Sequence, residues 1–203
     1  IGMAAQHSQS MERFFFGIPG LIVVAPSDPY TAKGLLKSAI RSDNPVIFFE
    51  HKLLYANSGP VPEGDYTLPL GKARIVRKGR DLTLVTHLLG VSAALDAAER
   101  LAGQGIEMEI VDLVTLYPMD TVTILESVSR TGALVTLEEG TATGGIGAEV
   151  ISRVSLAGFH LLKRPPLRFA APECPVPYAK NLENAMMPDP GKIAERIERW
   201  IKG

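Results

Sequence analysis

The sequence contains a single cysteine, Cys174, among 203 residues. One thiol excludes an intrachain disulfide and a cysteine-rich zinc site, and it is consistent with a reducing compartment. An excess of charge of one sign is also absent, because 21 Lys and Arg residues stand against 22 Asp and Glu residues, for a net charge of -1. A chain balanced in this way has no built-in attraction to nucleic acid or to an anionic membrane surface, so we expect neither as a partner.

Long hydrophobic runs are missing as well, since no apolar stretch approaches the roughly 20 residues that a membrane span needs. The sequence has no Ser/His/Asp nucleophile elbow, no HExxH and no CxxC. Acyl-hydrolase and zinc-hydrolase functions therefore lack support. The chain begins Ile1-Gly2-Met3, without an initiator Met or a basic leader, and we expect it to be part of a longer polypeptide.

What the sequence does contain is the composition of a globular domain, with 46% hydrophobic and 21% charged residues. Several short runs are apolar and rich in β-branched residues, which is typical of strands buried on both faces of a parallel sheet. The clear runs are 21–25, 46–49, 82–86 and 133–137, and the weaker ones are 107–111 and 167–171.

Helical patterns alternate with these strands. A stripe at 32–40 follows Asp28, a suitable N-cap, and Pro29, which fits the first helical turn. A second stripe at 91–102 ends at Gly103 and Gly105, residues suited to left-handed helix stops. Further helices are predicted at 121–129, with Asp120 as its cap, and from Ile193 to Ile201. The alternation predicts an α/β fold.

The pattern is interrupted at 57–71, a stretch rich in Pro, Gly and polar residues that is typical of a linker. We therefore predict a first unit at 1–56 and a second unit at 72–203. The first unit has two clear strands, too few for a well-covered sheet, so we expect that its beginning is missing.

Four histidines are candidate acids or bases, because imidazole titrates near neutral pH. His7 lies in a small, polar segment directly before a predicted helix at 11–16, and the alternative is that Ser8 or Ser10 caps that helix while His7 is only solvated. His87 and His160 are expected to be packed or edge histidines, and His51 to belong to a solvated charge cluster.

A glycine-rich loop at 140–147 follows a strand and opens a helix. It lacks the third glycine of the dinucleotide fingerprint and the Lys-Ser/Thr of a P-loop. A tight turn that allows close helix packing is favoured over an anion site. Glu138 and Glu139, at the end of the preceding strand, are expected to be a solvated pair.

Several segments taken together resemble one family. They are AAQHSQS, IPGLIVVAPSDPYTAKGLLKSAIRSDNPVIFFEHKLLY, PLGKARIVRKGRDLTLVTH, VDLVTLYPMD, GGIGAE and PECPVPYAKNLE. Their order over essentially the whole chain is similar to that of the β subunit of thiamine-diphosphate-dependent 2-oxo-acid dehydrogenases, a group that includes pyruvate, branched-chain 2-oxo-acid and acetoin dehydrogenases.

The resemblance implies that 1–56 is the back half of a thiamine-binding pyrimidine domain. It implies that 72–203 is a transketolase C-terminal-like, three-layer α/β domain with a mostly parallel sheet. Thiamine diphosphate would lie at an interface with the α subunit, which holds the diphosphate and magnesium through a Gly-Asp-Gly motif. The chain has no such motif, since Glu63-Gly64-Asp65-Tyr66 departs from it at the last position. The family's glutamate that contacts the aminopyrimidine ring would precede Ile1.

The same resemblance matches His7 to the family's active-site histidine, which exchanges protons with the cofactor-bound substrate and assists acyl transfer. It also implies a structural potassium ion at the turn that contains Ala39, Ile40, Ser42 and Asn44. A carboxylate commonly stands where Ser42 stands here, and its loss weakens a site for a hard cation.

The resemblance therefore implies oxidative decarboxylation of a 2-oxo acid, with acyl transfer to lipoyl-lysine. The implied partners are an α subunit, a second β subunit and the dihydrolipoyl acyltransferase core, in the bacterial cytoplasm or, less favoured, the mitochondrial matrix. Three alternatives stay open: a non-catalytic module for subunit pairing and core docking, an acetoin-cleaving homologue, and another thiamine enzyme of the transketolase type. The sequence does not distinguish the substrates.

Overall fold

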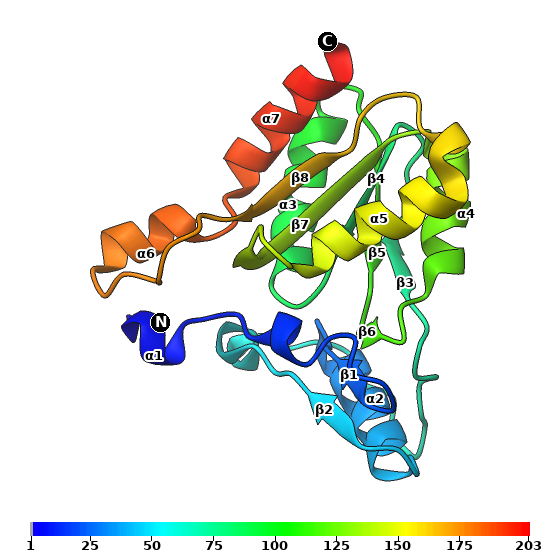
Figure 1. Ribbon diagram of the computed structural model, residues 1–203, viewed down its shortest axis with the longest axis vertical. Coiled ribbons are helices and arrows are strands. Elements are labelled where there is room, and N and C mark those ends of the chain that lie inside the picture. Colours follow the sequence, from blue (N-terminus) through cyan, green and yellow to red (C-terminus); the bar gives the residue numbers. More distant parts are fainter. Residues whose placement is uncertain (1) are drawn as a thin grey trace.

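A computed structural model describes residues 2–203. Two α/β units lie one above the other, with the N-terminal unit below and the larger C-terminal unit above (Figure 1). The lower unit has a three-stranded sheet of order β2-β1-β6, and the upper unit has a five-stranded sheet of order β3-β5-β4-β7-β8. The predicted α/β class is therefore confirmed.

The lower unit is built on a strand–helix–strand segment. Strands β1 (Ile22–Val24) and β2 (Val46–Phe48) are parallel and are joined by α2 (Pro29–Ile40). The predicted start of α2 is confirmed, because Asp28 Oδ1 accepts from Thr31 N at 2.7 Å and Asp28 N donates to Thr31 Oγ1 at 3.2 Å. This reciprocal capping satisfies two backbone donors, and Pro29 occupies a position that needs no N–H.

The apolar stripe predicted on α2 is only partly buried. Leu35 is fully buried, whereas Leu36 is 47% and Ile40 is 75% exposed. The predicted helix is therefore confirmed, while the stripe is buried at Leu35 and largely exposed at these two positions.

Short helical turns surround this sheet. They are α1 (Ala4–His7), η1 (Glu12–Phe14) and η2 (Lys52–Ala56). The third strand, β6 (Thr115–Tyr117), pairs antiparallel with β1 although it comes from beyond the predicted linker. The two units are thus joined by a shared sheet, which the sequence pattern did not predict.

The upper sheet is mostly parallel, as predicted. Its parallel strands are β4 (Leu82–Thr86), β5 (Met108–Asp112), β7 (Leu134–Thr141) and β8 (Leu167–Ala171). The edge strand β3 (Arg74–Arg77) runs antiparallel to β5. All five residues of β4 and of β5 are buried, which explains their nearly continuous apolar sequence.

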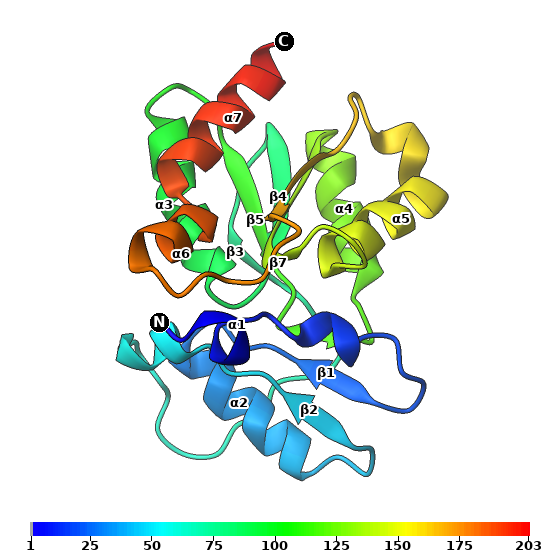
Figure 2. The same ribbon diagram turned by 60° about the vertical axis from the view of Figure 1, so that its left-hand side comes forward.

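Helices cover both faces of the upper sheet and complete the three layers (Figure 2). Helices α3 (Gly90–Ala102) and α7 (Pro190–Lys202) pack on one face, and α4 (Thr121–Thr131) and α5 (Ile146–Gly158) pack on the other. The turn η3 (Phe159–Leu161) follows α5, and α6 (Lys180–Met186) precedes α7.

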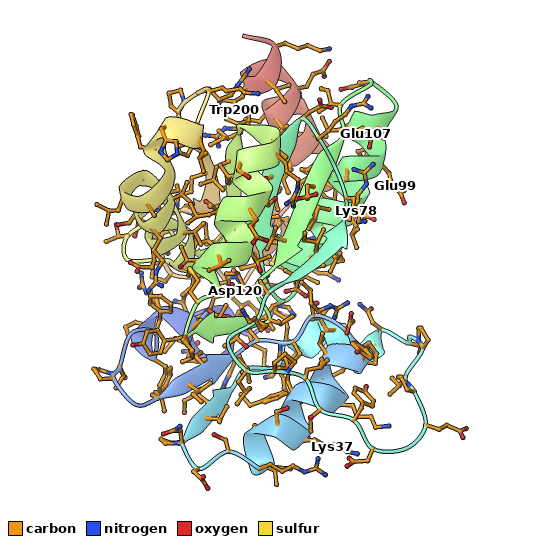
Figure 3. All side chains as sticks on the ribbon, turned by 90° about the vertical axis from the view of Figure 1, so that its right-hand side faces the viewer. Lys37, Lys78, Glu99, Glu107, Asp120 and Trp200 are labelled. Atoms are coloured by element: carbon orange, nitrogen blue, oxygen red, sulfur yellow. The ribbon has the colours of Figure 1, made fainter. Side chains whose placement is uncertain are left out.

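Two of the predicted helix boundaries have different outcomes. Helix α3 ends at Gly103 as predicted, but Gly103 keeps a helical φ of -60°, and the predicted left-handed conformation is found only at Gly105, with a φ of 78°. Asp120 caps α4 as predicted, with Oδ1 accepting from Thr123 N at 3.2 Å, and its Oδ2 also accepts from Ala73 N at 3.1 Å. Figure 3 shows Asp120 at the level where the two units meet, between Lys37 below and Trp200 above.

The carboxyl ends of the upper strands face the lower unit. The Ser27 hydroxyl, after β1, donates to the Asp112 carboxyl at the end of β5. His51, after β2, contacts Glu139 near the end of β7. In open α/β sheets ligands bind at this end of the strands, so a ligand site is expected at the boundary between the two units. Within residues 2–203 no helix has the length and apolarity to span a membrane.

Candidate active site

A cavity of about 190 Å³ lies at this boundary. Its walls come from the segment around α1 and η1, from the segment after β2, and from the carboxyl ends of the upper strands. The residues on which the chemistry depends are His7, Glu12, His51 and Glu139. The cavity thus brings together side chains that are widely separated in the sequence.

His7 is the last residue of α1, and its exposed side chain lies on the wall of the cavity. The predicted helix at 11–16 is only the single turn η1, and it has no side-chain cap. The alternative that Ser8 or Ser10 caps a helix there was therefore wrong. An accessible imidazole at the rim of a cavity can give or accept a proton at neutral pH.

His51 is fixed by contacts at both ring nitrogens. Its Nδ1 accepts from Leu53 N at 3.3 Å, so its proton is on Nε2, which lies 3.1 Å from Glu139 Oε2. The two side chains are only 20% and 13% exposed. The prediction of a solvated charge cluster was wrong, because packing of the upper sheet against the lower unit covers the end of β2.

Glu12 lies in the same cavity and is 7% exposed. Burial, together with the nearby charges of Glu139 and Glu138, raises the pKa of its carboxyl to about 7, although its own backbone N–H and His51 oppose the shift. Sequence reasoning missed this residue. The available signal was an acid inside the largely apolar segment 11–16, where a solvated carboxylate is not expected.

His87 follows β4 and is buried, as predicted for a packed histidine. Desolvation lowers the pKa of its imidazole to about 4, so the ring is neutral at physiological pH. His160 is exposed in η3 and does not line the cavity.

The glycine-rich loop packs closely on the Glu138 side chain. Gly147 N donates to Glu138 Oε1 at 3.1 Å, and Arg168 Nη2 donates to the same oxygen at 2.7 Å. A Cβ at Gly147 would lie 2.6 Å from Glu138 Oε1, so the close approach requires glycine. The tight-packing interpretation is confirmed. The expectation that Glu138 and Glu139 are solvated was wrong, because β8 and α5 cover the first and His51 covers the second.

The predicted potassium ligands lie together on the turn that ends α2. Ser42 N donates to the Ala39 carbonyl at 3.2 Å, and Asn44 N donates to Ser42 Oγ at 3.1 Å. Ile40 and Asn44 are exposed, and none of the four residues lines the cavity. The oxygens of these four residues are neutral, and the neighbouring Asp43 is the acidic residue of the turn.

The residues of the cavity fit one end of thiamine diphosphate. Across residues 2–203 no group of three or more Asp, Glu, His or Cys side chains is arranged to hold a metal ion. The cavity instead offers proton-exchanging groups, His7 and Glu12, of the kind that the reacting end of the cofactor needs.

Comparison with known families matches both units. Residues 2–57 match the transketolase pyrimidine binding domain, and residues 71–193 match the transketolase C-terminal domain. The second match alone covers more than half of the chain.

Individual relatives are β subunits. The chain is 47% identical over 197 residues to the pyruvate dehydrogenase E1 component subunit beta of Rhizobium meliloti (strain 1021), covering 97% of this chain and 43% of the relative. It is 48% identical over 200 residues to the acetoin:2,6-dichlorophenolindophenol oxidoreductase subunit beta of Cupriavidus necator, covering 98% and 59%. It is 46% identical over 192 residues to the 2-oxoisovalerate dehydrogenase subunit beta of Bacillus subtilis (strain 168), covering 94% and 59%. The chain thus spans roughly half of the length of these relatives.

A solved structure described as "split gene transketolase, inactive beta4 tetramer" superposes with a TM-score of 0.79 at 22% identity, covering 98% of this chain and 63% of that one. At this level of identity the likeness shows the fold. The two family matches establish that the chain belongs to the transketolase family, with a pyrimidine binding domain followed by a transketolase C-terminal domain.

Proposed function

We propose that this chain acts as the β subunit of a thiamine-diphosphate-dependent 2-oxo-acid dehydrogenase, in an assembly with an α subunit that holds the diphosphate and magnesium. The observation that carries the proposal is the position of His7 on the wall of a cavity between two family-matched units. The identity of 46–48% to three such β subunits supports it.

When bound, thiamine diphosphate supplies the nucleophilic carbon and the electron sink that decarboxylation of a 2-oxo acid requires. The part of this chain is to hold and move protons beside the reacting carbonyl. His7 is accessible, so it can exchange a proton with the reacting group and take part in acyl transfer to a lipoyl group. The buried wall formed by His51 and Glu139 limits the entry of water.

The test is an assembly of the chain with an α subunit, assayed for reductive acylation of lipoamide with pyruvate and with branched-chain 2-oxo acids, and for acetoin oxidation with a dye acceptor. We expect turnover with one of these substrate classes. We expect His7→Ala to lower turnover by roughly 100-fold while the assembly still binds thiamine diphosphate. His160→Ala is the matched control, because His160 is exposed and does not line the cavity.

The outcomes separate the alternatives. Full activity of His7→Ala would exclude the proton-carrying role. Assembly without turnover would instead favour a module for subunit pairing and docking to the acyltransferase core. Turnover with acetoin alone would favour the acetoin-cleaving class, and one relative at 48% identity is an acetoin oxidoreductase subunit. The proposed partners of the active assembly are the α subunit, a second β subunit and the dihydrolipoyl acyltransferase core.

We also propose that the turn with Ala39, Ile40, Ser42 and Asn44 binds potassium. Its support is the cluster of backbone and hydroxyl oxygens at the end of α2. Potassium is expected to raise the thermal unfolding midpoint relative to sodium, and Ser42→Asp to enlarge the difference by adding a charged oxygen. Equal midpoints in the two salts for both proteins would reject the site. We place the assembly in the bacterial cytoplasm, or in the mitochondrial matrix.

A further inference from the structure

Glu12 is a buried carboxyl group on the wall of the cavity. Within residues 2–203 it takes part in no ion pair. The next residue, Arg13, reaches away from it and donates to Thr141 Oγ1 at 2.5 Å and to the Thr143 carbonyl at 2.8 Å. A carboxyl group that is buried without a cation is stabilised in its protonated form.

The acidic groups that face Glu12 strengthen this preference by raising the pKa of its carboxyl, whereas His51 and the backbone N–H of Glu12 oppose it. The end of β7 presents Glu138 and Glu139, and the segment after β2 presents His51. Arg168 of β8 is bonded to Glu138 and so does not neutralise Glu12. Glu139 lies beside His51, with 3.1 Å between His51 Nε2 and Glu139 Oε2.

The remaining titratable groups of the cavity do not alter this arrangement. His87, behind Leu88, is neutral because burial lowers the pKa of its ring to about 4. Glu50, Lys52 and Glu183 also line the cavity, from the segment after β2 and from α6. Only Lys52 among these adds a positive charge, and it forms no ion pair with Glu12 in the described part of the chain.

We propose that Glu12 is a second acid–base residue of this cavity, a neutral carboxyl that donates its proton to the oxygen of a carbonyl substrate held beside His7. This inference rests on the proposed function, because the substrate class comes from there. The pKa of about 7 caused by burial agrees with the geometry. A carboxyl group with a pKa near physiological pH can both give and regain a proton.

The step is a proton transfer and needs no further reactant. The O–H bond of the Glu12 carboxyl breaks, a new O–H bond forms on the substrate oxygen, and Glu12 is left as a carboxylate. The carboxylate is disfavoured by the charge of Glu139, so it takes a proton back from solvent or from the product. His7 then serves the second proton transfer of the cycle, and the two residues divide the acid–base work.

Two measurements on the assembled α–β complex test the proposal. The first is the infrared difference spectrum between the wild-type complex and Glu12→Gln, recorded as a function of pH. We expect a protonated-carboxyl band that disappears as the pH rises through about 7. The second is the pH dependence of kcat, in which Glu12→Gln should remove one ionisation and lower kcat by roughly 100-fold with little change in KM. Glu12→Asp, which keeps an acid, should recover part of the activity.

Glu63→Gln provides the matched control, since Glu63 is exposed and does not line the cavity. Absence of the protonated band at pH 6 overturns the proposal, and so does an unchanged pH profile of Glu12→Gln. A wild-type complex without turnover on any substrate class is a failure of the proposed function instead, and the infrared titration then still decides whether Glu12 holds a proton at neutral pH.

Discussion

The Nε2 atom of His51 lies 3.1 Å from Oε2 of Glu139, and this contact joins the lower unit to the carboxyl end of β7 in the upper sheet. The Ser27–Asp112 hydrogen bond and the Arg74–Asp28 ion pair, with 3.0 Å between Nη1 and Oδ2, join the same two units. The wall of the cavity is therefore built across the boundary, and its geometry depends on how the units pack.

The His51–Glu139 contact should be measurable as a coupling energy. A double-mutant cycle with His51→Ala and Glu139→Gln is expected to give about 0.5–1 kcal/mol in urea unfolding, because the pair is largely screened from water. The exposed pair Lys202–Glu198 is the control and should give about 0.3 kcal/mol, as is usual for i,i+4 pairs on helices. A coupling of zero between His51 and Glu139 would contradict the contact.

Asp112 should make the stability of the chain fall as the pH rises. Burial raises the pKa of this carboxyl from 3.8 to about 7, although Ser27 and the Val114 amide donate to it. Between these values the folded chain holds a proton that the unfolded chain releases, so the free energy of unfolding decreases with increasing pH, by at most about 1.4 kcal/mol per pH unit for this group.

Asp112→Asn removes this titration while it keeps the shape of the side chain. We expect the unfolding free energy of the variant to change less between pH 5 and pH 8 than that of the wild-type chain. The raised pKa of Glu12 also makes the free energy of unfolding fall as the pH rises, so Glu12→Gln serves as the parallel measurement. In the variant with both substitutions, the free energy of unfolding should depend on pH even less. An equally steep decrease in the Asp112→Asn chain would show that Asp112 is ionised in the folded state.

Local signals in the sequence were sufficient for many, but not all, of the elements of the fold. The cap at Asp28, Pro29 after it, and the apolar run of β4 each depend on neighbours within a few residues, and each was predicted correctly. Strand β6 was not predicted, because it is only three residues long and exists through its pairing with β1.

The site was predictable only in part, because most of its residues are brought together by contacts between segments that are distant in the sequence. His7 was found because it lies in a short polar segment that resembles a family motif. Glu12, His51 and Glu139 were missed or taken for solvated groups, because their burial arises from the contact between units that are distant in the sequence. Sequence patterns report which side chains a local element buries, and they carry little information about which charges a neighbouring unit covers.

Gly147 should tolerate no side chain. A Cβ there would lie 2.6 Å from Glu138 Oε1 and 2.7 Å from Thr136 Oγ1, so Gly147→Ala must displace α5 or a buried polar group. We expect a loss of about 1–3 kcal/mol in the free energy of unfolding. Gly59→Ala is the control, since its added Cβ would make an ordinary contact of 3.5 Å with Pro29. A loss in Gly147→Ala no larger than in the control would contradict the packing of α5 on Glu138.

The Arg168–Glu138 pair gives the most discriminating stability measurement. Glu138 is buried, and burial already raises the pKa of its carboxyl although Arg168, 2.7 Å away, opposes the effect. Arg168→Met removes the opposing charge and leaves the carboxylate without a cation. We expect a loss of about 3 kcal/mol at neutral pH, and a smaller loss at low pH, where Glu138 is protonated in both the folded and the unfolded chain.

The double variant Arg168→Met/Glu138→Gln separates a buried charge from a simple packing defect. Because it removes both charges, it should recover most of the stability lost in Arg168→Met, and its stability should depend less on pH. Arg80→Met is the control, because Arg80 is exposed and lies 3.9 Å from Asp81, so its removal should cost little. If the double variant is as unstable as Arg168→Met alone, the arginine acts through the packing of its side chain against β7, and the charge of Glu138 has no part in the loss.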